Sequence, residues 1–314
     1  MTARGRFTLA ILAALGGLAV AAASEKEANI PTDGVRIAMV RTLFRDTPES
    51  LIRVMMQPFA ALMESQTGLP GKLVSGGDAA KVGQMLAEDK VHIGVFHGVE
   101  FAWARQKYPE IKPLMIAVNQ SRILQAFIVV RGDAAPASLA DLKGKTLALP
   151  RCTREHCHLF LEHRCQECGL EPSGYFSTTT LPPTIEDALD DVVDNIVQAA
   201  LVDGVGLKCY ERRKPARFAQ LKTIASSEIF PAAVVAYHPG TLDDATLTRF
   251  REGMINANKG ALGRQFMTLW RLTAFEPVPT DYEQTLADIL KTYPVPPAKA
   301  PAKGAPIAAQ QASD

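Results

Sequence analysis

Residues 79–98 read AAKVGQMLAEDKVHIGVFHG, and this stretch decides the fold class. Its first half predicts a helix over 79–88, and its second half predicts a strand over 91–96. The flanking segments predict further strands over 35–40 and 72–75, and further helices over 48–67 and 99–107. Strand, helix, strand, helix, strand at this spacing is typical of a parallel α/β unit with right-handed crossovers.

A second α/β pattern begins near residue 126. It opens with a strand over 127–131 and continues with a strand over 146–149 that leads into a cysteine-rich helix. The remaining expected elements are helices over 138–144, 181–196, 206–213, 243–262 and 282–292, and strands over 199–203 and 232–237. Two α/β lobes would place a ligand crevice between them, and helix N-termini in such a crevice favour anions.

Composition excludes several classes of protein. Of the 314 residues, 47% are apolar and 21% are charged, which does not fit a disordered or fibrous chain. The 34 basic and 33 acidic residues nearly cancel, so the chain has no surplus positive charge with which to bind nucleic acid or an anionic membrane surface.

The two ends of the chain have their own signatures. Arg4 and Arg6 precede an uncharged run from Phe7 to Val20 and a small-residue pattern, so residues 1–23 are expected to be a signal peptide cleaved near Ala23. A membrane anchor is the alternative, but the run is short of the roughly 20 residues that span a bilayer. An exported chain is allowed disulfides. Residues 294–314 are rich in Pro, Ala and Lys and predict a disordered tail.

Five segments together resemble the phosphonate, phosphite and phosphate branch of the type II periplasmic solute-binding proteins that serve ABC transporters. They are the strand over 35–40, the stretch 79–98, FIVVRGD over 127–133, SLADLKGKTLA over 138–148 and PAAVVAYHP over 231–239. The resemblance implies two Rossmann-like lobes joined by a two-segment hinge, with lobe 1 over 35–125 and 236–293 and lobe 2 over 126–235. It also implies a monomer in the periplasm that closes on a small oxyanion or polar solute and is read by an inner-membrane permease. No catalytic residue and no cofactor are expected.

The resemblance also places the ligand contacts. The family's oxyanion loop at a helix N-terminus corresponds to Thr153-Arg-Glu-His-Cys157, where Arg154 could replace hydroxyl groups with a charged fork and Glu155 would repel a phosphonate. The expected ligand-binding residues are Asp78, His97, Thr153, Arg154, His156 and Asp203.

Cysteine and histidine crowd one segment. Seven of the 17 residues from 152 to 168 are Cys or His, at a spacing that matches neither a zinc ribbon nor a haem motif. One interpretation is structural disulfides among Cys152, Cys157, Cys165, Cys168 and Cys209. The alternative is a thiol and imidazole site at Cys152, His156 and Cys157 for a soft metal or trivalent arsenic, in a sensor that docks on a kinase.

Charged runs occur near the second lobe's later helices. Glu186, Asp187, Asp190, Asp191 and Asp194 follow helical spacing, which favours a solvated face over a metal site. The basic run 212–214 ends a helix, where positive charge suits the helix dipole, and it predicts a solvated cap.

Overall fold

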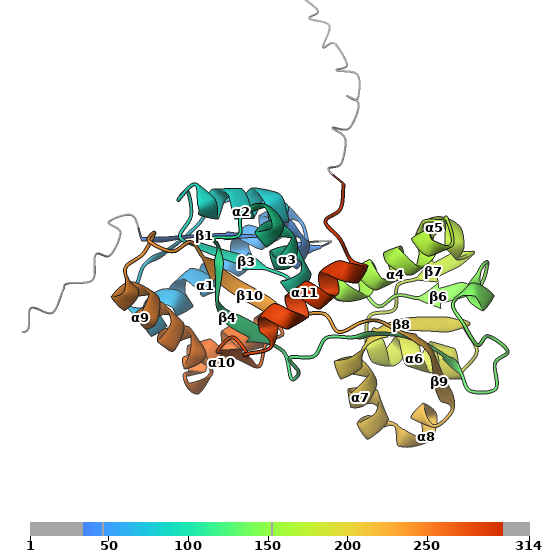
Figure 1. Cartoon of the computed structure of the whole chain (residues 1–314). Helices are drawn as coiled ribbons and strands as arrows, with labels where there is room; N and C mark the ends of the chain where they lie inside the picture. Colours follow the sequence, from blue (N-terminus) through green and yellow to red (C-terminus); the bar gives the residue numbers. More distant parts are fainter. Residues whose placement is uncertain (1–33, 46, 152, 298–314) are drawn as a thin grey trace, which may run out of the picture.

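The computed structural model describes residues 34–45, 47–151 and 153–297. The described chain forms two mixed sheets that lie side by side, each covered by helices (Figure 1). The larger sheet has the order β11-β4-β10-β3-β1-β2, and the smaller has the order β7-β6-β8-β5-β9. The predicted α/β class with two Rossmann-like sheets is therefore confirmed.

The larger sheet contains the elements first read from the sequence. Its strands are β1 (Val35–Met39), β2 (Gly71–Leu73), β3 (Ile93–Phe96), β4 (Lys112–Val118), β10 (Ala233–Tyr237) and β11 (Ala274–Glu276). β2 and β3 run parallel to β1 as predicted, and β10 joins antiparallel to β3 and β4. Alternation along these strands sends even-numbered side chains such as Phe96 to one face and odd-numbered ones such as Val95 to the other.

Each face of the larger sheet has its own helical layer. One face packs on α2 (Ala79–Ala87), α3 (Gly98–Lys107) and α11 (Tyr282–Thr292). The other packs on α1 (Glu49–Thr67), α9 (Asp244–Ile255) and α10 (Ala261–Leu269), with the 3-10 turns η1 (Arg41–Phe44) and η3 (Ala257–Lys259) at its edges. α1 ends at Gly68, whose φ of 67° is the left-handed conformation that glycine adopts without strain.

The smaller sheet lies between two further helical layers. Its strands are β5 (Ala126–Arg131), β6 (Thr146–Ala148), β7 (Thr178–Thr180), β8 (Ala199–Asp203) and β9 (Leu221–Ser226). Its helices are α4 (Glu155–Glu167), α5 (Pro172–Tyr175), α6 (Ile185–Val193), α7 (Gly204–Arg213) and α8 (Pro215–Phe218), with the turn η2 (Ala140–Leu142). The cysteine-rich segment forms α4, whose apolar side packs on β5 and β8.

Two segments connect the sheets, residues 119–125 outward and 227–232 in return. They pair with one another, because Phe230 N donates to Leu124 O at 2.9 Å and Gln125 Nε2 donates to Ser227 O at 3.1 Å. A paired two-segment crossing is the kind of connection about which two bodies can rotate.

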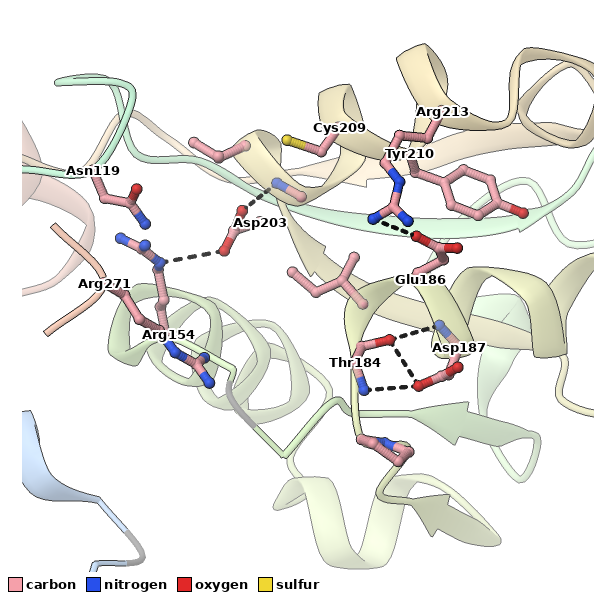
Figure 2. Close-up of a pocket in the computed structure, with 14 residues that line it drawn as sticks. Asn119, Arg154, Thr184, Glu186, Asp187, Asp203, Cys209, Tyr210, Arg213 and Arg271 are labelled. Atoms are coloured by element: carbon pink, nitrogen blue, oxygen red, sulfur yellow. Dashed lines mark hydrogen bonds and ion pairs between the residues drawn. The ribbon is translucent and has the colours of Figure 1, made fainter. Parts of the chain in front are cut away.

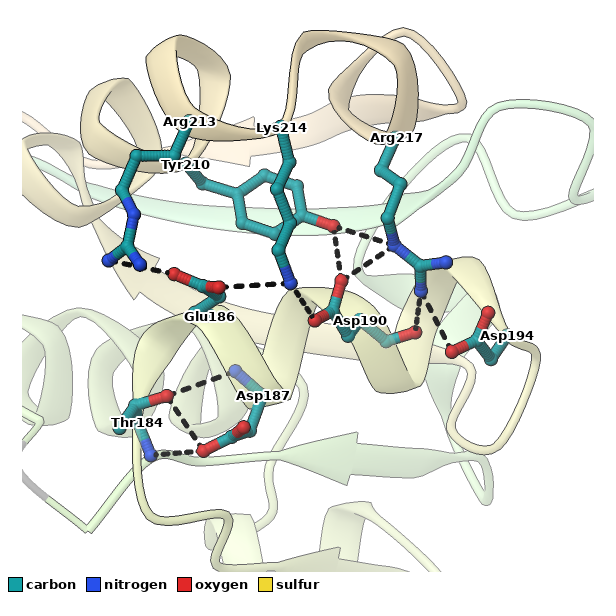
Figure 3. Close-up of polar contacts among 9 residues, drawn as sticks. All are labelled: Thr184, Glu186, Asp187, Asp190, Asp194, Tyr210, Arg213, Lys214 and Arg217. Carbon is teal, nitrogen blue, oxygen red and sulfur yellow. Dashed lines mark hydrogen bonds and ion pairs between the residues drawn. The ribbon is translucent and has the colours of Figure 1, made fainter.

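The acidic face of α6 is not simply solvated. Figure 3 shows it paired with α7 and α8: Asp190 accepts from Tyr210 OH at 2.7 Å, Lys214 Nζ at 2.5 Å and Arg217 Nε at 2.7 Å. The basic residues predicted to be a solvated helix cap thus pack against the acidic residues predicted to be a solvated face. Sequence spacing could not show that the two helices are neighbours.

The expected signal peptide over 1–23 lies outside the described residues, as do residues 298–314 of the expected tail. Within the part of the chain that the structure describes, no helix combines the length and apolar character needed to cross a membrane.

Candidate functional site

A cavity of about 820 Å³ opens where the two sheets meet. Its polar end is lined from the larger-sheet side by Thr42, Arg45 and His97, which follow the carboxyl ends of β1 and β3. The smaller-sheet side contributes Thr153, Arg154, Glu155 and His156 at the start of α4. Ligand sites of α/β sheets are expected at such strand ends, and the volume lies within the usual range of roughly 300–1,000 Å³.

Two helices begin at this cavity without a side-chain cap. His97 is the N-cap residue of α3 and Arg154 that of α4, and neither side chain accepts a hydrogen bond from its own helix. By contrast, Thr184 caps α6 and Asp203 caps α7 through their own side chains. Neither histidine nor arginine is among the preferred N-cap residues, and here neither side chain offers an acceptor to the first-turn N–H groups. An anion in the cavity could supply the missing acceptor.

The cavity lining carries an excess of positive charge. Arg45, Arg151, Arg154 and Arg271 face it, and Glu155 is the one carboxylate among its described lining residues. Two of the lining histidines add little charge near neutral pH: burial lowers the pKa of His156 to about 4 and also lowers that of His97. Arginine side chains and the two helix N-termini therefore provide the attraction for an anion.

Glu155 is paired across the gap between the sheets. Its carboxylate accepts from Arg45 Nε at 2.7 Å and Arg45 Nη2 at 2.5 Å, and its side chain is 5% exposed against 36% for Arg45. This bidentate pair offsets the repulsion that a carboxylate at the start of α4 would exert on an anion.

Glu100 is a second buried carboxyl group near Glu155. Glu100 of α3 is 4% exposed and accepts from Thr42 Oγ1 at 2.7 Å. Burial, reinforced by the charge of Glu155, raises the pKa of Glu100 to about 7. Near neutral pH it is therefore partly protonated, and it repels an anion less than an ordinary glutamate would.

A second cavity of about 550 Å³ lies on the other side of Arg154 (Figure 2). It is lined by Arg154, Arg213 and Arg271 against three acidic residues, Glu186, Asp187 and Asp203, so its charges balance. Figure 2 shows Arg154 facing Asp203, with 3.4 Å between Nε and Oδ2, and Arg213 facing Glu186. The larger cavity is the better anion site.

The structure brings together most of the predicted ligand-binding residues. His97, Thr153, Arg154 and His156 line the larger cavity, and Arg154 and Asp203 line the smaller. Asp78 lines neither of these cavities. Its carboxylate accepts from Lys81 N at 2.8 Å and caps α2, which is a structural role.

Sequence reasoning missed two residues that line both cavities, Asn119 and Arg271. Asn119 directly follows β4, a strand that was not predicted, although the apolar run 114–118 before a polar residue was a usable signal. Arg271 follows α10 with a φ of 51°, and its position depends on how α10 packs on α1.

The predicted disulfides are not confirmed: the four cysteines that the structure describes, Cys157, Cys165, Cys168 and Cys209, are all free. Cys157 and Cys165 are eight residues apart on α4, about 12 Å along the helix axis, whereas disulfides need Cα atoms within about 7 Å. Cys168 and Cys209 lie in different surroundings, with their sulfur atoms near Tyr175 and Arg212. Cys152 lies outside the described residues.

The alternative metal or metalloid site finds no support in the described residues. They contain no group of three or more His, Cys, Asp or Glu side chains able to hold a metal ion. Cys157 Sγ lies 3.5 Å from His156 Nε2, but burial raises the pKa of the Cys157 thiol well above its usual value, and a protonated thiol is a poor ligand.

Two α/β sheets, a paired two-segment crossing and a cationic cavity at their junction define a type II periplasmic solute-binding protein. Residues 44–282 match the family described as ABC transporter, phosphonate, periplasmic substrate-binding protein, and the chain belongs to that family. The predicted family and the predicted absence of an enzymatic role are thus confirmed, because this family is a solute-binding component of transporters.

Solved structures agree on the fold. A binding protein component of an ABC phosphonate transporter from Pseudomonas aeruginosa is 18% identical with a TM-score of 0.50, over 82% of this chain and 85% of that chain. PhnD1 from Prochlorococcus marinus, in complex with methylphosphonate, is 11% identical with a TM-score of 0.53, over 83% and 98%. A Xanthomonas citri protein bound to ATP is 15% identical with a TM-score of 0.53, over 82% and 96%. No curated protein matches the chain.

Proposed function

We propose that this protein captures an organic phosphonate in the larger cavity and presents it to an ABC permease in the inner membrane. The observation that carries the proposal is the pair of uncapped helix N-termini, α3 at His97 and α4 at Arg154, facing one cavity in which arginine outnumbers carboxylate. The phosphonate oxygens would accept from the first-turn N–H groups and from the Arg154 fork. The complex of PhnD1 with methylphosphonate supports this ligand chemistry.

The capture mechanism follows from the position of the binding groups. Arg154 belongs to the smaller-sheet side, while His97 and Arg271 belong to the larger-sheet side. An oxyanion between them would hold both sides together, with rotation about the paired segments 119–125 and 227–232. We take lobe 1 as 35–125 and 236–293 and lobe 2 as 126–235, although the second boundary falls within β10, which pairs in the larger sheet. Export by the 1–23 signal peptide, residence in the periplasm and a monomeric state are part of the same proposal.

Calorimetry on the purified protein tests this function with methylphosphonate, phosphite, phosphate and sulfate. We expect heat with a phosphorus oxyanion, and we expect Arg154→Ala to weaken binding about 10- to 100-fold, because a charge-assisted hydrogen bond contributes about 1.5–3 kcal/mol. Arg213→Ala is the matched control, since Arg213 lines only the smaller of the two cavities and pairs with Glu186 at 3.0 Å. Absence of binding to every phosphorus oxyanion, or equal loss in both variants, would refute the proposal.

A further inference from the structure

The larger cavity changes character away from its arginines. One wall of the cavity is a face of the larger sheet. Alternation along the strands places apolar side chains on this face. The wall residues from β1, β3, β4, β10 and β11 are Met39, Ile93, Val95, Met115, Ala117, Ala233, Val235 and Phe275. None of these wall residues has a charged or hydrogen-bonding side chain.

The opposite wall is equally apolar. Phe44 of η1, Phe59 of α1, Phe250 and Met254 of α9 and Phe266 of α10 line it. These side chains are 9% exposed or less and belong to the same apolar cluster as the sheet residues that form the first wall. The cavity therefore runs from the junction of the sheets into the space between the larger sheet and its helical layer.

An apolar cavity of this size is expected to bind a ligand. Protein cores are close-packed and leave few voids larger than a water molecule, and an apolar void does not hold water well. A phosphonate head group alone would fill only the end at Arg154 and His97. The rest of the 820 Å³ is shaped and lined for an apolar group joined to that head.

Trp270 supplies an independent sign of a ligand. Its indole Nε1 is buried and has no hydrogen-bond partner among the described residues, although its ring packs edge-on to Phe44 at 5.5 Å and stacks with Phe266 at 5.7 Å. Buried N–H groups normally find an acceptor. Since Trp270 lines the cavity, an oxygen of a bound phosphonate could provide one.

We infer that the ligand is an amphiphilic phosphonate, with its oxyanion at Arg154 and an apolar substituent of several carbons lying between the larger sheet and helices α1, α9 and α10. This inference rests on the proposed function and specifies its substrate class. Binding energy then comes from two separable sources, a charge-assisted grip on the head and burial of the apolar substituent.

A chain-length series tests the inference on the unmodified protein. Methyl-, butyl- and octylphosphonate are titrated by calorimetry, with octylamine as a control that has the same chain and the opposite head-group charge. Each buried methylene should tighten binding about three- to fourfold, so octylphosphonate should bind at least about 100-fold more tightly than methylphosphonate. Octylamine, which brings a positive charge to the arginines, should not bind.

Two variants locate the substituent. Val235→Phe would fill part of the apolar end of the cavity, because Val235 lies in the middle of β10 and within the apolar cluster. It should therefore weaken octylphosphonate about tenfold or more and leave methylphosphonate unchanged. Octylphosphonate should also alter the fluorescence of Trp270, a change that persists in Trp103→Phe and is lost in Trp270→Phe. Trp103 is the matched control because its indole N–H already donates to Tyr293 O at 2.9 Å.

The outcomes separate the two claims. If methyl- and octylphosphonate bind equally, the amphiphile inference fails and the proposed function stands. If no phosphonate of any length binds, the proposed function fails and the inference fails with it. If octylamine binds as tightly as octylphosphonate, the cavity selects only apolar chains and the inference is overturned.

Discussion

At the scale of single residues, Glu100 has the most consequential titration. It is 4% exposed, and its pKa of about 7 lies above the ordinary 4.5, first because of burial. Between these two values the unfolded chain has lost the proton that the folded protein still holds. Stability contributed by the protonated group is therefore present below pH 4.5 and is lost as the pH rises toward 7.

We expect Glu100→Gln to remove this pH-dependent loss of stability. From pH 5 to pH 8 the free energy of unfolding of the unmodified protein should fall relative to that of the variant, by at most about 3 kcal/mol. Urea unfolding at both pH values measures the difference. The comparison must be with the variant, because burial lowers the pKa of His92 and His156 to about 4 and gives a stability change of opposite sign. Glu186→Gln, which removes a partly exposed carboxylate, is the control, and equal pH dependence in all three proteins would contradict the prediction.

The residue types at helix starts predicted the cavity-lining residues best, but the same signal also selected a residue that lines neither cavity. His97 and Arg154 were predicted from their places after a strand and before a helix, and both line the larger cavity. Asp78 occupies the same kind of place but caps its own helix. Aspartate is a preferred N-cap residue and satisfies first-turn N–H groups by itself, whereas the side chains of His97 and Arg154 leave those groups without a side-chain acceptor. The residue types are visible in the sequence, and this distinction would have separated Asp78 from His97 and Arg154.

At the scale of elements, α4 shows how a crowded motif resolves into ordinary packing. Cys165 is fully buried in the core of the smaller-sheet side, and burial raises its pKa to about 11. Cys168, at the end of the helix, is exposed. The helical period places these thiols in different environments although they are only three residues apart.

We expect thiol alkylation to follow that difference. Brief treatment with iodoacetamide at pH 8, followed by peptide mapping, should modify Cys168 in the native protein and Cys165 only after unfolding, since the reactive species is an accessible thiolate. A disulfide-linked peptide that contains either residue, or modification of native Cys165, would contradict this assignment.

The contact between α6 and the helices α7 and α8 depends chiefly on Asp190. Its carboxylate accepts from Tyr210, Lys214 and Arg217, and its side chain is 24% exposed. We expect Asp190→Ala to lower the free energy of unfolding by about 1–2 kcal/mol. Asp194→Ala is the control one turn later: Asp194 is 51% exposed and pairs with Arg217 alone, so its loss should be under about 0.5 kcal/mol. Denaturant titration distinguishes the two, and equal losses would refute the role of Asp190.

Elements with strong local patterns were predicted closely, and those that depend on distant partners were not. β8 (Ala199–Asp203) and α11 (Tyr282–Thr292) have the predicted bounds. β4 and β9 were missed, because each is defined by antiparallel pairing with strands far away in the sequence. The helix predicted over 181–196 starts later, at Ile185, where Thr184 and Asp187 form a capping box.

At the scale of the whole molecule, contacts near both ends of α4 join it to the larger-sheet side and the crossing segments. At one end of α4, Arg45 pairs with Glu155. Toward the other, the Tyr293 ring after α11 lies 5.0 Å from His163 and 4.7 Å from Phe230, and its hydroxyl donates to Glu228 at 2.9 Å. Phe230 belongs to the crossing segment 227–232 and Tyr293 packs on it, where rotation moves atoms least. The Arg45–Glu155 pair spans the cavity mouth, where rotation moves them most.

The Arg45–Glu155 pair therefore bears on ligand capture. Glu155 is the first residue of α4, so its carboxylate is close to where a phosphonate would accept from the same helix, and it holds an arginine that lines the same cavity. The protein's own carboxylate thus competes with the ligand for one cationic group. It also holds the two sides together before any ligand arrives.

We expect Glu155→Gln to have two effects of opposite sense. Ligand-free protein should become more open, with a larger radius of gyration in X-ray scattering, because the charge-assisted pair across the mouth is lost. Methylphosphonate should bind several-fold more tightly, because a buried negative charge near the oxyanion is removed, an interaction of about 1 kcal/mol or more at a partly solvated site. Glu186→Gln is the matched control, since Glu186 lines only the smaller of the two cavities and should change neither measurement. If Glu155→Gln instead weakens binding without changing the radius of gyration, the carboxylate positions α4 for the ligand and does not compete with it.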